Sequence, residues 1–289
     1  MARPWFRKAT ERTVDARASS DRVPSDLAVK CPNSQCGQIL LQKELEKDLK
    51  VCKKCGYHFR LTAQERLDML LDEGSFQAYE FGLKTGDPLC FPGYPEKLFR
   101  HQKRTGMSEA VVAGCGLIGR HPAAVCVTDY NFMAGTMNSV VGETLARTLE
   151  NAIEGSMPAL LVSGSGGGAR MEESILSLMQ MAKTAAAMER FSEERLLSIC
   201  ILTDSTMAGI FASWASLGDV ILAEPGATIG FTGERVAAKV QTEKEPANFR
   251  TAEFNYEHGM IDQVTPRAQL KETVERLLAV DARRTGEAG

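Results

Sequence analysis

Residues 159–170 have the sequence Ala-Leu-Leu-Val-Ser-Gly-Ser-Gly-Gly-Gly-Ala-Arg, a short apolar run that leads directly into a glycine-rich turn. The apolar run, Ala159–Val162, has the length of a strand that is buried on both faces. The residues after the turn, Glu172–Arg190, are rich in Leu, Met and Ala and have the length of a helix. A buried strand, a glycine turn and a long helix in this order indicate an α/β protein with parallel strands.

The same order recurs along the chain from about residue 108. Val141, Leu145, Leu149 and Ile153 lie four residues apart and predict a helix over Ser139–Glu154. Further strands are expected at 109–114, 123–129, 197–203, 220–223 and 228–230, and further helices at 208–217, 234–240 and 268–280.

The segment before residue 108 follows a different pattern. Thr62 and Glu65 form a capping-box pattern, and Gly74 is suited to end the helix that begins there. From Phe76 to Thr105, prolines and glycines predict an irregular stretch. This stretch is expected to end in a basic patch, which consists of Lys97, Arg100, Lys103 and Arg104.

The 289 residues are 44% hydrophobic and 25% charged, which is the composition of an ordinary globular protein of one or two domains. This composition excludes a wholly disordered chain, a collagen-like repeat and a disulfide-stapled miniprotein. The net charge of −3 argues against a chain built as a whole around nucleic acid. No apolar run approaches the roughly 20 residues of a membrane span, and the loose polar tail 1–27 has no signal-peptide pattern. We therefore expect a cytoplasmic protein without membrane insertion.

Four of the eight cysteines form two close pairs near the N-terminus, Cys31 with Cys36 and Cys52 with Cys55. In a reducing compartment this spacing indicates a four-thiolate metal site rather than disulfides. Zinc fits because four sulfur ligands satisfy it in a tetrahedron, and a site with four protein ligands leaves no open position. The prediction is one structural zinc ion per chain, held by a small module over residues 28–60. The alternative is four unrelated buried cysteines.

Three kinds of anion site can be considered for the glycine-rich turn, and two of them do not fit. Gly164, Gly166 and Ala169 match a loose dinucleotide-binding fingerprint, but the acidic residue needed about 20 positions later falls inside the following helix. The turn also lacks the Gly-Lys-Ser/Thr ending of a P-loop. The remaining interpretation is an oxyanion hole, in which the backbone N–H groups of Gly167 and Gly168 face a thioester oxygen that becomes an enolate.

These motifs resemble the β subunit family of the bacterial and plastid acetyl-CoA carboxylase carboxyltransferase. The resemblance covers about residues 28–280 and rests on the cysteine module together with a series of short motifs. Three of those motifs are Gly-Tyr-His-Phe-Arg at 56–60, Val-Val-Gly-Glu at 140–143 and Gly-Gly-Ala-Arg-Met-Glu-Glu at 167–173. The others lie at residues 66–74, 178–183, 217–219, 223–225, 229–231 and 257–262.

The resemblance implies a crotonase-like α/β fold over residues 61–289, the ClpP/crotonase superhelix of β-β-α units, preceded by a four-cysteine zinc ribbon at 28–60. It implies one subunit of a biotin-dependent carboxyltransferase, which moves a carboxyl group from carboxybiotin to acetyl-CoA and gives malonyl-CoA for fatty-acid synthesis. Biotin would arrive on the biotin carboxyl carrier protein, since this chain has no Met-Lys-Met attachment sequence. Further expected partners are an α subunit, in an α2β2 assembly, and biotin carboxylase.

The resemblance also implies roles for single residues. The family's Gly-Gly pair matches Gly167 and Gly168, and Gly166, Ala169 and Arg170 are expected to bind substrate beside that pair. The family's zinc ligands match Cys31, Cys36, Cys52 and Cys55, although the first pair is two residues wider than usual.

Three loops differ from the family's usual pattern. Ala-Gly-Thr-Met-Asn at 134–138 replaces Gly-Gly-Ser-Met-Gly, and Asp-Ser-Thr-Met-Ala-Gly at 204–209 replaces Asp-Pro-Thr-Thr-Gly-Gly. Gly166 replaces the serine that usually precedes the Gly-Gly pair. All three loops are expected to line the active cleft, so a specialised paralogue that carboxylates another acyl-CoA is an alternative.

Two hypotheses come from other functional classes. Residues 31–60 carry a net charge of +3. This charge is compatible with weak nucleic-acid binding and equally with an ordinary solvent-exposed face. One hypothesis is therefore a zinc-ribbon nucleic-acid-binding protein with an inactive enzyme domain. A self-sufficient hydratase or hydrolase is the other. It needs a carboxylate in the cleft, and Glu172 or Glu173 would be the first candidates.

Overall fold

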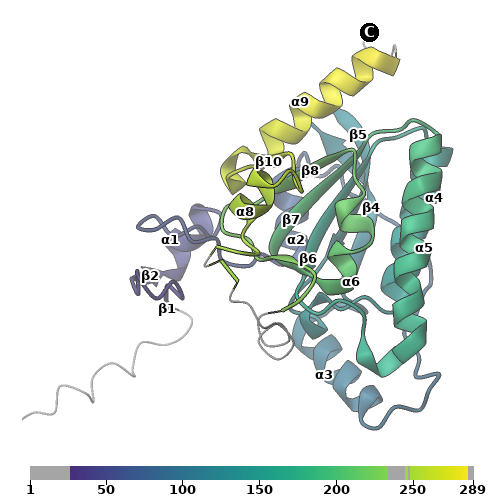
Figure 1. Ribbon diagram of the computed structural model, residues 1–289, viewed down its shortest axis with the longest axis horizontal. Helices are drawn as coiled ribbons and strands as arrows, with labels where there is room; N and C mark the ends of the chain where they lie inside the picture. The colour runs from purple at the N-terminus through teal and green to yellow at the C-terminus, as the bar shows by residue number, and fades with distance from the viewer. Residues whose placement is uncertain (1–26, 234–244, 247, 286–289) are drawn as a thin grey trace, which may run out of the picture.

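The computed structural model describes residues 27–233, 245–246 and 248–285. Within these residues, one sheet of eight strands forms the centre of the protein (Figure 1), with the order β10-β8-β7-β6-β5-β4-β3 and with β9 paired to β7. The strands are β3 (Gln77–Ala78), β4 (Val111–Ile118), β5 (His121–Thr128), β6 (Ala159–Ser165), β7 (Ser198–Met207), β8 (Val220–Ala223), β9 (Ile229–Gly230) and β10 (Gln263–Val264).

The sheet is mixed, with its parallel part in the middle. β4 and β5 form an antiparallel hairpin, whereas β5, β6, β7, β8 and β10 run parallel to one another. All residues of β6 are buried, as expected for a strand with neighbours on both edges and helices on both faces. The prediction of an α/β protein with parallel strands is therefore confirmed.

Alternate residues of the central strands point into two separate apolar cores. Val125 and Val127 of β5 pack with helix α2 (Ala63–Leu70) and helix α9 (Arg267–Thr285) on one face of the sheet. Cys126 packs into the other core, with helix α4 (Ser139–Glu154) and helix α5 (Ser174–Glu193), which lie side by side in Figure 1. This alternation follows from the two-residue period of a strand and gives the domain three layers.

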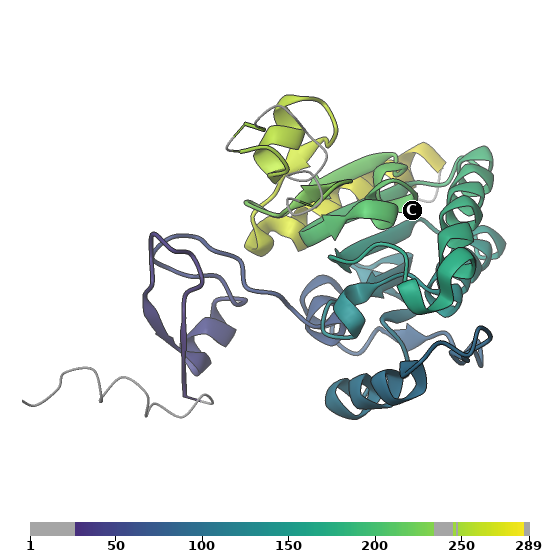
Figure 2. The same ribbon diagram turned by 60° about the horizontal axis from the view of Figure 1, so that its bottom comes forward.

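The N-terminal module lies to one side of this domain (Figure 2). It contains β1 (Ala28–Lys30) and β2 (Ile39–Leu41), which pair antiparallel, and the short helix α1 (Gln42–Lys47). The chain then enters α2 at Thr62, where the predicted capping box is present. The Thr62 hydroxyl accepts from the Glu65 N–H at 3.2 Å, and the Glu65 carboxylate accepts from the Thr62 N–H at 2.8 Å.

Several predicted boundaries need correction. α2 ends at Leu70 because Leu71 is already extended, so Gly74 is not its terminator. β6 and β7 continue to Ser165 and Met207, into the turns that were expected to follow them. The predicted helix at 208–217 is α6 (Ala208–Phe211) followed by a 3₁₀ turn, and the predicted helix at 234–240 lies outside the described residues.

The stretch from Phe76 to Thr105 was predicted to be irregular, and this is wrong for its second half. Residues Tyr94–Thr105 form helix α3, with Pro95 in its first turn and Gly106 at its C-terminus in the left-handed conformation. The predicted basic patch therefore lies on a helix. A second unpredicted helix, α8 (Ala252–Glu257), begins at the cap residue Thr251.

Candidate active site and metal centre

The four predicted zinc ligands come together within the N-terminal module. The sulfur atoms of Cys31, Cys36, Cys52 and Cys55 all lie within 4.8 Å of one another. The Cys31–Cys55 and Cys36–Cys52 sulfur pairs are 3.6 and 3.9 Å apart. A tetrahedron with Zn–S bonds of about 2.3 Å has edges of about 3.8 Å, so these sulfurs match a closed, structural zinc site.

The turns around the cysteines support the same assignment. Backbone N–H groups of Asn33 and Gln38 donate to the sulfurs of Cys31 and Cys36. Gly37, which follows Cys36, has a left-handed φ of 56° that lets the tight turn form. Such donors stabilise thiolates, which is the form that binds zinc.

A buried ion cluster joins this zinc ribbon to the domain. The Glu224 carboxylate pairs with the Arg66 guanidinium at 2.7 Å and with the Arg267 guanidinium at 2.7 Å, and all three side chains are almost fully buried. Burial opposes the charge of Glu224, but the two arginines hold its pKa well below the usual range. Arg267 also donates to the backbone carbonyl of Leu49 at 2.7 Å, which connects the cluster to the ribbon.

The glycine-rich turn at 166–168 is packed so closely that side chains would not fit. A Cβ at Gly167 would lie 2.2 Å from the Thr136 methyl group, and a Cβ at Gly168 would lie 2.7 Å from the Ala208 methyl group. Gly168 also has a φ of 61°, in the left-handed region. Glycine is therefore required at both positions by contact and, at Gly168, also by backbone conformation.

The backbone amides of this turn divide into two groups. The Gly166 N–H donates to the Ala134 carbonyl at 3.0 Å, and the Arg170 N–H donates to the Met137 carbonyl at 2.8 Å. Within the described part of the chain, the N–H groups of Gly167, Gly168 and Ala169 have no acceptor, and the first two are adjacent glycine amides. These two adjacent donors are the pair that the sequence assigned to an oxyanion hole, and that assignment remains a prediction.

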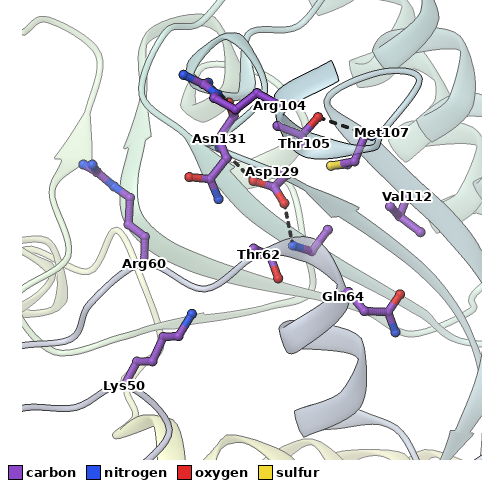
Figure 3. Close-up of a pocket in the computed structure, with 11 residues that line it drawn as sticks. Lys50, Arg60, Thr62, Gln64, Arg104, Thr105, Met107, Val112, Asp129 and Asn131 are labelled. Carbon is purple, nitrogen blue, oxygen red and sulfur yellow. Dashed lines mark hydrogen bonds between the residues drawn. The ribbon is translucent and has the colours of Figure 1, made fainter. Parts of the chain in front are cut away.

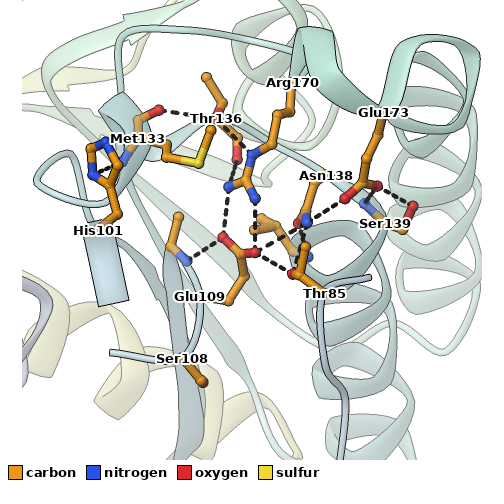
Figure 4. A network of polar contacts seen from close by, with 12 residues as sticks. Thr85, His101, Ser108, Glu109, Met133, Thr136, Asn138, Ser139, Arg170 and Glu173 are labelled. Carbon is orange, nitrogen blue, oxygen red and sulfur yellow. Dashed lines mark hydrogen bonds and ion pairs between the residues drawn. The ribbon is translucent and has the colours of Figure 1, made fainter. Parts of the chain in front are cut away.

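Arg170 has a different environment from the one expected of a substrate-binding side chain. Its guanidinium is 0% exposed and forms two hydrogen bonds with Glu109, at 2.8 and 2.6 Å (Figure 4). Burial opposes this charge, but the paired Glu109 carboxylate raises the pKa of Arg170 above its ordinary value. The guanidinium also donates to the Thr136 carbonyl at 3.0 Å. In this structure the guanidinium fixes the loop opposite the glycine turn, and the assignment of Arg170 to substrate binding remains a prediction.

The two carboxylates considered for a hydratase are both engaged elsewhere. Glu173 is buried and accepts from the Asn138 amide at 2.8 Å and from the Tyr94 hydroxyl at 3.0 Å. Burial raises the pKa of Tyr94 to about 12, so this hydroxyl keeps its proton and donates it. Glu172 pairs with Lys97 at 2.5 Å. Burial opposes the negative charge of Glu172, but the ion pair with Lys97 lowers the pKa of this carboxyl below its ordinary value. The structure thus offers neither carboxylate as a free acid or base.

A cleft of about 630 Å³ separates the ribbon from the domain (Figure 3). Lys50 and Arg60 line it from the ribbon side, and Arg104 and Asn131 line it from the domain side. The Arg60 guanidinium lies 3.7 Å from the centre of the Tyr130 ring. It also donates to the Asp204 carboxylate at 3.0 Å.

Tyr130 and Asp204 connect this basic cleft to the glycine turn. A Cβ at Gly166 would lie 2.7 Å from the Tyr130 ring and 2.6 Å from the hydroxyl of Ser205, the residue after Asp204. A serine at position 166, which the resemblance led us to expect, would therefore collide with this chain's own neighbours. Sequence reasoning missed Arg60 and Tyr130. The sequence did contain a signal for Arg60, because this residue is the last one of the motif Gly-Tyr-His-Phe-Arg at 56–60.

Comparison with known protein families gives two matches. The carboxyl transferase domain matches residues 58–262, and the acetyl-CoA carboxylase zinc finger domain matches residues 29–55. A protein of Desulforamulus reducens named acetyl-coenzyme A carboxylase carboxyl transferase subunit beta is 52% identical over 271 residues, which cover 93% of each chain. A protein of the same name from Desulforudis audaxviator is 48% identical over 275 residues, or 95% of this chain and 98% of that one.

Solved structures show the same fold at lower identity. Transcarboxylase 12S aligns with 76% of this chain and 41% of its own, with a TM-score of 0.64 and 24% identity. A Pseudomonas malonate decarboxylase hetero-tetramer aligns with 76% of this chain and 82% of its own, with a TM-score of 0.61 and 22% identity. The expected crotonase-like fold is thereby confirmed.

The described residues contain no helix with the length and apolar character needed to cross a bilayer. The two domain matches place the zinc ribbon and the transferase domain in the expected order along the chain. The relatives match nearly the whole chain at about half identity. This chain belongs to the acetyl-CoA carboxylase carboxyl transferase subunit beta family.

Proposed function

We propose that this chain is the β subunit of a biotin-dependent carboxyltransferase that carboxylates acetyl-CoA to malonyl-CoA, and that the N–H groups of Gly167 and Gly168 hold the thioester oxygen. The observation that carries this proposal is the pair of adjacent amides just after β6 that find no acceptor among the residues the structure describes. Two fixed donors stabilise the negative charge that develops on the thioester oxygen when the acetyl group loses its α-proton. Each well-placed donor contributes on the order of 3 kcal/mol in a dry site.

The walls of the turn favour a small acyl group. Ala134 and Ala208 stand where the family usually has glycine, and both have left-handed φ angles, of 56° and 52°. Their methyl groups, with that of Thr136, lie against the glycine turn. They reduce the space beside the two amides, which supports acetyl-CoA over a longer acyl-CoA as substrate.

Carboxybiotin, brought by the carrier protein, would supply the carboxyl group and, after releasing it, a ureido nitrogen that accepts the α-proton. The chain's own task is then to orient the thioester and to hold its oxygen. This division of labour agrees with the engagement of Glu172 and Glu173 in other contacts. Gly166 and Ala169 flank the donor pair, and we retain them as substrate-binding candidates through their backbone.

We assign the expected α subunit to the exposed apolar face that begins at Met171 and continues along α5. Met171, Ile175, Leu178 and Met179 are all more than half exposed, and the last three share one face of the helix. Such a cluster marks a protein interface. The α subunit would complete the site with a second pair of oxyanion donors for the biotin side, in the α2β2 assembly, with biotin carboxylase and the carrier protein as further partners.

The remaining expectations are part of the same proposal. We place the ribbon at residues 28–60 and the transferase domain at 61–289, with residues 1–27 as a tail, in a cytoplasmic protein. Weak contact of the ribbon with nucleic acid has less support, because Lys53 pairs with Asp48 at 2.9 Å and Lys50 pairs with Glu65 at 2.5 Å. Loss of any salt-dependent binding on changing Lys53 and Lys54 to Glu would measure that contact.

The test is reconstitution with the α subunit, biotin carboxylase and biotinylated carrier. Malonyl-CoA is expected from the complex and not from the isolated chain. Gly168→Ala should lower kcat on the order of 10²-fold, since its new methyl group displaces the donor pair. Gly74→Ala is the matched control, because Gly74 has a similar φ of 71° but no neighbour within 4 Å of its Cβ position. Full activity of Gly168→Ala, or no carboxylation by folded complex, would contradict the proposal.

A further inference from the structure

His101 of α3 makes a contact that none of the expected functions uses. Its Nδ1 atom accepts a hydrogen bond from the Met133 N–H at 3.1 Å (Figure 4). The centre of its ring lies 5.8 Å from that of the Phe132 ring. The Arg104 guanidinium, 2.9 Å away, approaches the same nitrogen. Two donors facing one ring nitrogen require a lone pair there, which assigns the ring as neutral, with its proton on Nε2.

The residue that donates to His101 begins an unusual turn. Met133, Ala134 and Gly135 have successive φ angles of 47°, 56° and 68°, all in the left-handed region. For a residue with a side chain this conformation costs roughly 1–2 kcal/mol, so two such residues in a row need outside support. The hydrogen bond from the Met133 N–H to His101 supplies support at the first residue of the turn.

This turn supports the glycine turn directly. The Ala134 carbonyl accepts from the Gly166 N–H at 3.0 Å. A Cβ at Gly135 would lie 2.3 Å from the Gly164 carbonyl, so the two backbones are in close contact. A shift of residues 133–135 would therefore move the backbone that leads into Gly167 and Gly168.

We propose that His101 is a positioning residue, whose neutral imidazole holds residues 133–135 in place and thereby holds the amides of Gly167 and Gly168, so that its protonation slows carboxyl transfer. The inference rests on the proposed role of those amides. Protonated Nδ1 has no lone pair, so it cannot accept from the Met133 N–H. Carboxyl transfer is then lost as the pH falls through the pKa of His101.

The charged groups around His101 favour the neutral ring. Burial is the largest influence that lowers its pKa, and Arg104, Lys97 and Arg100 of the same helix lower it further. From the facing segment, the ring meets the Met133 N–H, the Phe132 ring and the backbone of Asn131, whose hydrogen bond raises the His101 pKa but is outweighed by burial and the three cations.

The nearby carboxylates are engaged with other groups. Asp129 accepts from the Asn131 N–H at 2.8 Å, and Glu172 pairs with Lys97 at 2.5 Å. The turn is therefore expected to persist through neutral pH and to weaken below the ordinary histidine pKa of about 6.5.

The experiment compares His101→Asn and His101→Leu in the reconstituted complex, with kcat measured from pH 8 down to pH 5. Asn offers an uncharged acceptor near the Nδ1 position, so its kcat at pH 8 should stay within about threefold of the original and its acid limb should shift to lower pH. Leu offers no acceptor and should lower kcat about tenfold at every pH. His258→Asn is the control: among the described residues, exposed His258 contacts Phe254 of its own helix region, so its replacement should leave the profile unchanged.

A second measurement needs no activity. Amide hydrogen exchange of Gly166 in the isolated full chain should become faster in His101→Leu but not in His101→Asn, since this amide donates to Ala134. An unchanged acid limb in His101→Asn, or unchanged Gly166 exchange in His101→Leu, would overturn the positioning role. If instead the exchange pattern appears while the wild-type complex makes no malonyl-CoA, the proposed reaction fails and the structural role of His101 stands.

Discussion

The zinc ribbon and the transferase domain are held together by different forces. In the ribbon, the apolar side chains of Ile39 and Leu41 are 64% and 53% exposed, and Leu45 is buried together with the zinc-site cysteines Cys31 and Cys52. The domain instead buries two apolar clusters, one on each face of its sheet. A module with so little apolar burial depends on its metal, whereas the domain has the core of an independent folding unit.

The join between the two regions uses a third kind of interaction. Besides the Glu224 cluster, the ribbon contacts the domain through Arg60 with Asp204 and through Lys50 with Glu65. Charged contacts are directional, so they fix the orientation of the ribbon over the cleft better than an apolar patch would. The comparison therefore predicts that loss of the zinc, loss of the contacts between ribbon and domain, and loss of domain stability can be produced separately.

Removal of zinc should have the largest effect and should be confined to the ribbon. Structural zinc sites contribute about 10–16 kcal/mol of apparent binding energy in zinc-finger peptides, which is far more than the apolar contacts of residues 28–60 can replace. Chelation, or Cys52→Ser, should unfold the ribbon while the domain keeps its cooperative unfolding transition. Hydrogen exchange, resolved by segment, measures both regions in one experiment.

Cys126→Ser is a useful comparison for the zinc experiment, because Cys126 is buried in the domain core and lies outside the metal site. It should destabilise the domain and leave the zinc content unchanged. If the amides of residues 28–60 remained protected from hydrogen exchange after complete removal of zinc, this would contradict the idea that the two regions depend on different forces.

Glu224→Gln should have the next largest effect, at the join. The change leaves Arg66 and Arg267 buried without a counter-charge, which costs about 3–5 kcal/mol of unfolding free energy when a buried pair loses one partner. Because Arg267 also binds the Leu49 carbonyl, the ribbon should lose part of its contact with the domain while retaining zinc. Chemical denaturation together with zinc analysis would separate the two effects.

The stabilisation of the fold by the Glu224 cluster should depend on pH in a definite direction. The pKa of Glu224 is lower in the folded protein than in the unfolded chain, so the unfolded chain binds the proton first. The stabilisation is complete above the unfolded carboxyl pKa of about 4.3 and decreases as the pH falls below it. Glu224→Gln should lack this acid-dependent loss, and an unchanged dependence would show that other carboxylates cause it.

The same contrast explains what the sequence could predict. The ribbon depends on four residues of one type at short spacing, so Cys31 to Cys55 identified the metal site without a structure. Strands and helices of the domain follow local periodicity, and α4 was predicted to the residue. The boundaries that failed, such as the ends of β6 and β7, depend on pairing with distant strands, which local sequence does not record.

The contacts made by the side chains around the glycine turn were beyond sequence reasoning for the same reason. Arg170 and Glu109 are 61 positions apart and meet only after β4, β5 and β6 are assembled. His101 lies on a helix that was itself predicted to be irregular. The glycines, by contrast, were found because their role depends on the backbone of one short segment.

Thr62→Ala should have the smallest effect on the unfolding free energy, and it gives the sharpest test of the boundary between the ribbon and the domain. Thr62 caps α2 at the first residues of the domain, and loss of a cap costs about 1 kcal/mol. Its partner Glu65 is shared with Lys50 of the ribbon, so the cap sits between the two regions. If metal alone holds the ribbon together, Thr62→Ala should lower the unfolding free energy of the domain and leave the zinc affinity unchanged. Serine at position 62 keeps the cap and should restore the domain, whereas a weaker zinc affinity in Thr62→Ala would mean that the ribbon depends on the domain for its own fold.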